Sequence, residues 1–144
     1  MIKGDILPFG NFKWQVLDIK DGKTLIITEG IIELRWYHKE FIEITWADCE
    51  IRAYLNNEFY KVFNQDEKAR IIPTVNSNYD NPWFKTKGGI DTTDRIFLLS
   101  LEEVCKHFGD SRENLKNKAS QKWQIEDENN IKRQAKFEDN FHWW

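Results

Sequence analysis

Apolar and polar residues alternate in a short run near the N-terminus. The alternation covers residues 12–17, which include Trp14, and a second apolar run covers 25–28. Between the two runs lies Asp21-Gly22, a pair that favours the type I′ turn of a two-residue β-hairpin. The pattern predicts a hairpin with Trp14 buried, and it marks 31–34 as a candidate third strand.

The spacing of apolar residues changes to three and four positions after Thr45. This spacing predicts a helix with one buried face. The apolar set of that face is Ile51, Leu55, Phe59 and Val62. Thr45 is the expected N-cap, and Asn56-Asn57 is a point at which the helix can break into two pieces.

Two further segments carry the signature of a capping box, in which a polar N-cap residue is followed three positions later by Glu. The first segment pairs Asn64 with Glu67. The second pairs Ser100 with Glu103 and predicts a helix over 101–108. The two pairs therefore predict two more short helices.

Residues 76–94 are rich in Asn, Asp, Gly, Thr and Pro and predict a long loop, and loops of this length are often functional. The apolar run 95–100 predicts a central strand. Residues 110–140 are charged with few apolar anchors, so irregular chain is expected there. Strands, then helices, one central strand and a last helix are typical of the α+β class.

The chain has 144 residues, which fits a single domain over 1–144. It carries 21 basic and 24 acidic residues, a net charge of −3, which argues against a nucleic-acid partner. An aromatic content of 15% excludes a disordered chain. The sequence shows no signal peptide and no apolar run long enough to cross a membrane, so a cytoplasmic protein is expected.

The residues with catalytic or metal-binding potential form no complete motif. The three histidines have no metal ligand at the usual spacing, and Gly88-Gly89 lacks the Lys-Ser/Thr of a phosphate loop. Cys49 and Cys105 are expected to be buried thiols, and a disulfide between them is the alternative. Cys105 is more typical of helix packing than of a nucleophile. We therefore expect no catalytic residue, no metal and no cofactor.

The 76–94 loop carries the candidate binding residues. Tyr79, Trp83 and Phe84 can form an aromatic platform for a ligand. Asp91 and Asp94 are oxygen donors of the kind found in calcium loops, but they lack the full ligand pattern. We expect one of these carboxylates to hold local backbone amides instead.

Several stretches together resemble an uncharacterised bacterial domain family, catalogued only as a domain of unknown function. The most specific of them are Asn81-Pro82-Trp83, Thr86-Lys87-Gly88-Gly89 and the run Asp91-Thr92-Thr93-Asp94-Arg95-Ile96-Phe97-Leu98-Leu99-Ser100. The similarity covers about residues 8 to 144. It implies a partial C-type-lectin-like fold, shared with formylglycine-generating enzymes, in which loops over a small sheet bind ligands.

In that family the Trp-Trp pair is followed by Leu-Arg-Ser-Pro-Gly and further strands, whereas Trp143-Trp144 closes this sequence. The resemblance therefore implies a C-terminally shortened version of a longer domain. Missing strands leave sheet edges unpaired, so self-association into a homo-oligomer is favoured; the alternative is a smaller sheet covered by the charged 110–140 region.

The leading hypothesis is a noncatalytic module that binds a protein or carbohydrate ligand through the 76–94 loop, with no membrane or nucleic-acid partner. One alternative is an enzyme related to formylglycine-generating enzymes. Another is a structural component of a phage or surface assembly.

Overall fold

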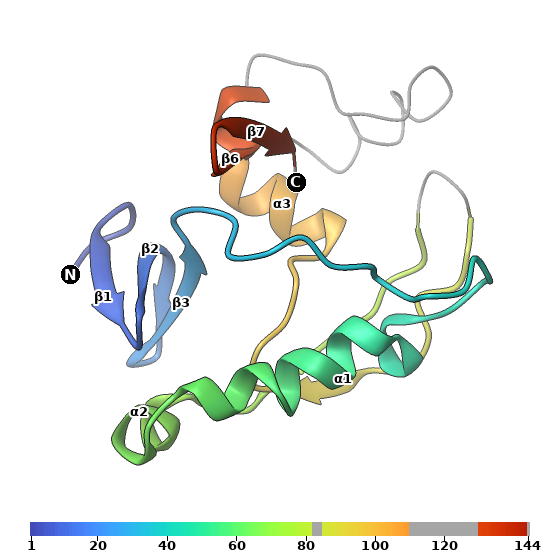
Figure 1. The fold of residues 1–144 in the computed structure, drawn as a ribbon, viewed down its shortest axis with the longest axis horizontal. Coiled ribbons are helices and arrows are strands. Elements are labelled where there is room, and N and C mark those ends of the chain that lie inside the picture. Colours follow the sequence, from blue (N-terminus) through green and yellow to red (C-terminus); the bar gives the residue numbers. More distant parts are fainter. Residues whose placement is uncertain (82–84, 110–129, 144) are drawn as a thin grey trace.

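The computed structural model describes residues 1–81, 85–109 and 130–143. An N-terminal sheet lies on one side of the molecule, helices α1 and α2 run along the bottom, and α3 lies with the C-terminal hairpin at the top (Figure 1). Residues 30–45 cross between these parts (Figure 1). The α+β class is confirmed, because short helices and small antiparallel sheets follow one another along the chain.

The N-terminal sheet contains the predicted hairpin. Strands β1 (Ile6–Phe9), β2 (Phe12–Lys20) and β3 (Lys23–Thr28) pair antiparallel in the order β1-β2-β3. At the turn, Asp21 and Gly22 have φ angles of 51° and 72°, as a type I′ turn requires. Trp14 is 8% exposed, so its predicted burial is confirmed. The third strand is β1, and residues 31–34 form none.

Strand β2 buries side chains on both faces of the sheet, because successive residues of a strand point to opposite faces. On one face Trp14 packs against Phe59 and Phe63. On the other face Leu17 packs against Val104 and Phe108 of α3. The sheet therefore lies between two groups of helices, and each face has its own apolar cluster.

The region that follows Thr45 forms three short pieces rather than one helix. They are a 3₁₀ helix over Trp46–Asp48, α1 over Glu50–Asn56 and a second 3₁₀ helix over Phe59–Val62. The break falls at Asn57, as expected. Thr45 does not cap a backbone N–H; its hydroxyl donates to the Asp48 carboxylate at 3.2 Å. Val62 is 48% exposed, because the break turns it away from the buried face.

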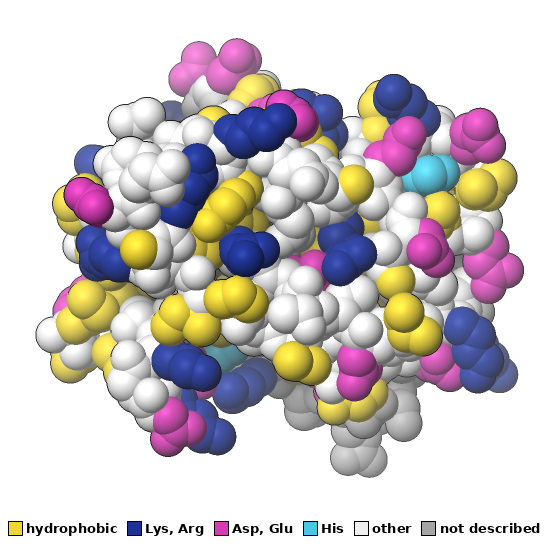
Figure 2. Space-filling view, turned by 90° about the horizontal axis from the view of Figure 1, so that it is seen from below, with side chains coloured by type: hydrophobic (Ala, Val, Ile, Leu, Met, Phe, Trp, Pro, Cys, Tyr) yellow, Lys and Arg dark blue, Asp and Glu magenta, His cyan; other side chains and the backbone are white. Residues whose placement is uncertain are grey.

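Both predicted capping boxes are present. Helix α2 (Gln65–Arg70) begins at Asn64, and α3 (Leu101–Phe108) begins at Ser100, each with reciprocal bonds to the Glu three residues later. From below, the face that carries α1 and α2 shows hydrophobic side chains in small groups between Lys and Arg (Figure 2). That face does not present one continuous apolar patch.

The central strand predicted at 95–100 is wrong in position. The strand is β5 (Thr92–Asp94), which pairs antiparallel with β4 (Thr74–Asn76). Residues 95–100 form no strand, and the side-chain amide of Asn56 occupies backbone groups at the start of this run. Its oxygen accepts from the N–H groups of Arg95 and Ile96, and its nitrogen donates to the Ile96 carbonyl.

The expectation of irregular chain over 110–140 is wrong for its last part. Strands β6 (Gln134–Phe137) and β7 (Asn140–Trp143) form an antiparallel hairpin after a 3₁₀ helix over Asn130–Arg133. The sequence hides this turn, because Glu138 rather than glycine or asparagine adopts the positive φ of 51°. None of the helices in the described ranges has the length and apolar character needed to cross a membrane.

Candidate functional site

The loop between β4 and β5 is held in shape by the side chain of Asp80. One carboxylate oxygen of Asp80 accepts from the Gly88 N–H at 3.1 Å, and the other pairs with the Lys87 ammonium at 2.8 Å. The hydrogen bond from Lys87 and that from Gly88 lower the pKa of Asp80 below its ordinary value. A Cβ at Gly88 would collide with the carbonyl oxygen of Asn78, so this turn requires glycine.

A second tie joins the two arms of the loop. The side-chain amide of Asn78 donates to the Ile90 carbonyl at 2.7 Å and to the Thr92 hydroxyl at 3.4 Å. The Asn81 N–H donates to the Thr86 carbonyl at 2.9 Å. The described parts of the loop are therefore ordered by contacts within the loop itself.

Asp94 lies at the base of the loop with its side chain fully buried. Its carboxylate accepts four side-chain hydrogen bonds, which come from Trp46 at 2.9 Å, Arg52 at 2.7 Å, Asn76 at 3.0 Å and Thr92 at 2.7 Å. Burial raises the pKa of Asp94, but the four hydrogen bonds outweigh burial and hold the pKa below its ordinary value.

The four partners of Asp94 come from different parts of the chain: the 3₁₀ helix before α1, α1 itself, β4 and β5. The expectation that a carboxylate of this cluster holds local backbone amides is therefore wrong for Asp94, because side-chain donors occupy it. Asp91 is exposed and makes no hydrogen bond with a described residue. The carboxylate of Asp94 thus joins α1 to the β4–β5 pair.

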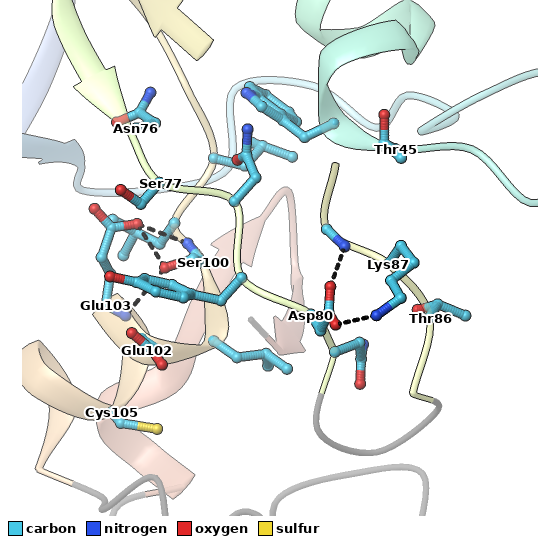
Figure 3. A pocket seen from close by; sticks show the side chains of 18 of the residues that line it. Thr45, Asn76, Ser77, Asp80, Thr86, Lys87, Ser100, Glu102, Glu103 and Cys105 are labelled. Atoms are coloured by element: carbon cyan, nitrogen blue, oxygen red, sulfur yellow. Dashed lines mark hydrogen bonds and ion pairs between the residues drawn. The ribbon is translucent and has the colours of Figure 1, made fainter. Parts of the chain in front are cut away.

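A hollow of about 930 Å³ lies beside this loop. Its walls are formed by residues 44–46, 74–81, 86–88 and 98–103, together with Tyr37, Cys105 and Lys106. The 76–81 segment passes between the start of α3 and the segment that carries Thr45 (Figure 3). Polar side chains of the loop and apolar side chains such as Leu98 both contribute, so the hollow offers hydrogen bonds and apolar contact together.

The predicted binding residues separate into three groups. Tyr79 lines the hollow and is 56% exposed. Asp91 and Asp94 do not line it. Trp83 and Phe84 lie outside the described residues, so the structure describes one residue of the predicted aromatic platform, Tyr79. Whether any of these five residues binds a ligand stays a prediction.

Sequence reasoning missed the other walls of the hollow. Asn76, Ser77 and Lys87 lay within the predicted loop, and their polar character was the available signal. Ser100 and Glu102 were assigned to the start of a helix, and no local pattern indicates that this helix faces the loop. Only the packing of α3 against the N-terminal sheet brings them there.

The cysteines are free and buried, as expected. The thiol of Cys49 donates to the Trp46 carbonyl at 3.2 Å, and Cys105 lies within α3 at 5% exposure. Across residues 1–81, 85–109 and 130–143, no three His, Cys, Asp or Glu side chains come together in a way that would hold a metal ion.

Comparison with protein-family models identifies a family for most of the chain. A family model described as "Domain of unknown function (DUF6273)" matches residues 21–144, a range that contains α1, the β4–β5 pair, the loop and α3. Searches of curated proteins and of solved structures gave no significant match.

Proposed function

The chain belongs to the DUF6273 family, whose description names no activity, and we propose that it is a noncatalytic binding module with its ligand site in the hollow beside β4. The observation that carries the proposal is the hollow itself. Its volume of about 930 Å³ lies within the range of small-ligand and peptide pockets, and it combines polar with apolar walls.

The loop that forms one wall of the hollow is already ordered by hydrogen bonds in the absence of a ligand, which supports this proposal. Asp80 fixes the Lys87-Gly88 turn, and Asp94 fixes the strands at the base of the loop. A site ordered in advance loses less conformational entropy when a ligand binds. The hydrogen bonds of Asp80 and Asp94 therefore give the loop the fixed shape that a recognition surface needs.

The charged groups of the hollow support binding rather than catalysis. The carboxylate of Asp80 is paired with Lys87, and its pKa is lowered, away from the range near 7 that suits a general acid or base. Cys105 is buried in α3, whereas a reactive cysteine is at least partly accessible. The alternative of an enzyme related to formylglycine-generating enzymes is therefore weaker.

A relation to C-type-lectin-like folds remains part of the proposal. In such folds the ligand residues lie on loops over a small sheet, and the loop proposed here connects β4 and β5, the two strands of a small sheet. This likeness supports the same surface by analogy alone.

A second candidate function is a structural component of an assembly, and one observation favours it. In the segment that crosses the molecule, Trp36 is 80% exposed, and Phe41 is fully exposed. Leu34 and Ile42 are 60% and 55% exposed. Exposed apolar side chains gathered in one segment often mark a protein interface.

Two probes and two variants test the proposal. The protein is screened on a glycan array and against a phage-displayed library of random octapeptides. Tyr79→Ala, inside the hollow, should weaken every retained ligand by about tenfold or more, because an aromatic contact is lost. Trp36→Ala is the matched control, since this aromatic side chain is exposed but does not line the hollow. A ligand whose binding is weakened by Trp36→Ala and not by Tyr79→Ala would support the assembly alternative. If neither the glycan array nor the peptide library yields a ligand, the proposal is contradicted.

A further inference from the structure

We propose that the ligand of this hollow is an extended peptide segment of a partner protein, which adds as a strand along the free edge of β4. This inference rests on the proposed function and names its ligand class. Its basis is the pairing of β4, the hydrogen bonds of the residues that follow it, and the charges around the hollow.

The hollow lies against the unpaired side of β4. Among the described strands, β4 pairs with β5 alone. All three residues of β4 line the hollow, and no residue of β5 does. In an antiparallel pair, alternate residues turn their N–H and C=O groups toward the partner and away from it. The groups of β4 that point away from β5 are therefore directed to the side of the hollow.

Ser77 continues this edge beyond the strand. It is exposed, it lines the hollow, and it makes no hydrogen bond with any described residue. Val75, two residues earlier on the same edge, is 69% exposed. An added strand usually pairs with the unpaired N–H and C=O groups of an accessible strand edge. Residues 74–77 offer four positions, or about 13 Å at roughly 3.3 Å per residue, for pairing with the backbone of a short peptide.

Another wall of the hollow, formed by residues 98–100, can take the side chains of such a peptide. Leu98, Leu99 and Ser100 run without regular structure along the hollow, and Leu98 is 44% exposed. Every second side chain of an added strand points to the same face. An apolar side chain at alternate positions would therefore meet Leu98 and Leu99 while the backbone pairs with β4.

The charges of the hollow favour a neutral or basic peptide over an acidic one. Both lysines that line it are already in ion pairs, Lys87 with Asp80 at 2.8 Å and Lys106 with Asp18 at 3.0 Å. Glu102 and Glu103 lie in the first turn of α3 and line the hollow, and the Glu103 carboxylate also accepts from the N–H and hydroxyl of Ser100. A Lys or Arg side chain of the peptide would complement these carboxylates, whereas Asp or Glu would be repelled.

The test begins with the same random octapeptide library and then alters single backbone N–H groups. Ser77→Pro removes the N–H of Ser77, and Ser77→Ala is the matched control that keeps this N–H and removes only the hydroxyl. We expect Ser77→Pro to weaken a selected peptide about tenfold or more, because a backbone hydrogen bond is lost, and Ser77→Ala to bind within about twofold of wild type. Equal binding of the two variants would overturn strand addition.

A second test changes only the peptide, so its result does not depend on whether the Ser77→Pro variant folds. N-methylation of the peptide at successive residues should abolish binding at alternate positions, because only every second N–H faces β4. In the complex, hydrogen exchange at the amides of the 74–77 segment should slow. The inference would be contradicted if N-methylation weakened binding at every position alike, or if hydrogen exchange at these amides were the same with and without the peptide.

The two screens separate this inference from the proposed function. If a glycan is retained in a Tyr79-dependent manner and no octapeptide binds, strand addition is wrong while a binding module stands. If neither probe binds, both fail. Enrichment of Asp and Glu among the selected peptides would overturn the charge argument, and enrichment of Lys and Arg would support it.

Discussion

Removal of the Asp94 carboxylate should destabilise the protein strongly. In Asp94→Ala the four donors of Trp46, Arg52, Asn76 and Thr92 lose their common acceptor. Breaking a buried ion pair by removing one partner costs about 3–5 kcal/mol. We expect about 3 kcal/mol, the lower end, because the Arg52 side chain is 28% exposed and can partly regain water.

Two further variants make this prediction specific. Asp94→Asn keeps the size of the side chain and one acceptor oxygen, so its loss should be smaller, about 1–3 kcal/mol. Asp91→Ala removes the same residue type three positions earlier from an exposed site, and its effect should stay within about 0.5 kcal/mol. Urea unfolding followed by tryptophan fluorescence gives the free energy of unfolding for all three variants.

The pH dependence gives an independent check. Because the pKa of Asp94 is lower in the folded protein, its stabilisation is complete above its unfolded pKa of about 3.9 and is lost as pH falls through the lower folded value. The stability difference between wild type and Asp94→Ala should therefore shrink below about pH 4. A loss under about 1 kcal/mol for Asp94→Ala, or an equal loss for Asp91→Ala, would refute the assigned role.

Three further predictions concern the hairpin, the capping of α3 and the loop. Trp14→Ala should cost about 3–5 kcal/mol in urea unfolding, because it removes the centre of an apolar cluster; a cost near zero would contradict that packing. Ser100→Ala should cost about 1 kcal/mol through the lost cap of α3, whereas Ser100→Thr should retain most of it. Gly88→Ala should speed hydrogen exchange over 78–81 and 86–91, since its Cβ meets the Asn78 carbonyl, and unchanged exchange would argue against that close approach.

Several predictions that depended on neighbouring residues were correct, although the cap expected at Thr45 and the strand expected at 31–34 are absent. The turn at Asp21-Gly22 and the capping boxes that begin at Asn64 and Ser100 each involve residues one to three positions apart. Their geometry follows from backbone conformations and side-chain reach that a short segment carries by itself. The same locality explains one error, since Glu138 adopts a positive φ without the glycine that would have signalled a turn.

Predictions that needed distant residues were incomplete or wrong. The partners of Asp94 include Asn76, Arg52 and Trp46, which lie 18, 42 and 48 positions away in the sequence. The apolar run at 95–100 satisfied the pattern of a central strand, but at its first two residues Asn56, about 40 positions earlier, takes backbone hydrogen bonds that a strand partner would use. No local pattern carries information about such contacts.

Short segments of the sequence account for the turn at Asp21-Gly22, the two capping boxes and the polar character of the 76–94 loop, because turns, caps and loop composition depend on a few neighbouring residues. Contacts between distant segments place this loop and α3 around one hollow and make the Asp94 carboxylate a buried acceptor of four hydrogen bonds, and among the described strands they leave β4 paired with β5 alone. These features arise only when the two apolar faces of the N-terminal sheet pack against separate helices and bring distant segments together. Burial of apolar surface, which depends on the whole chain, sets those positions.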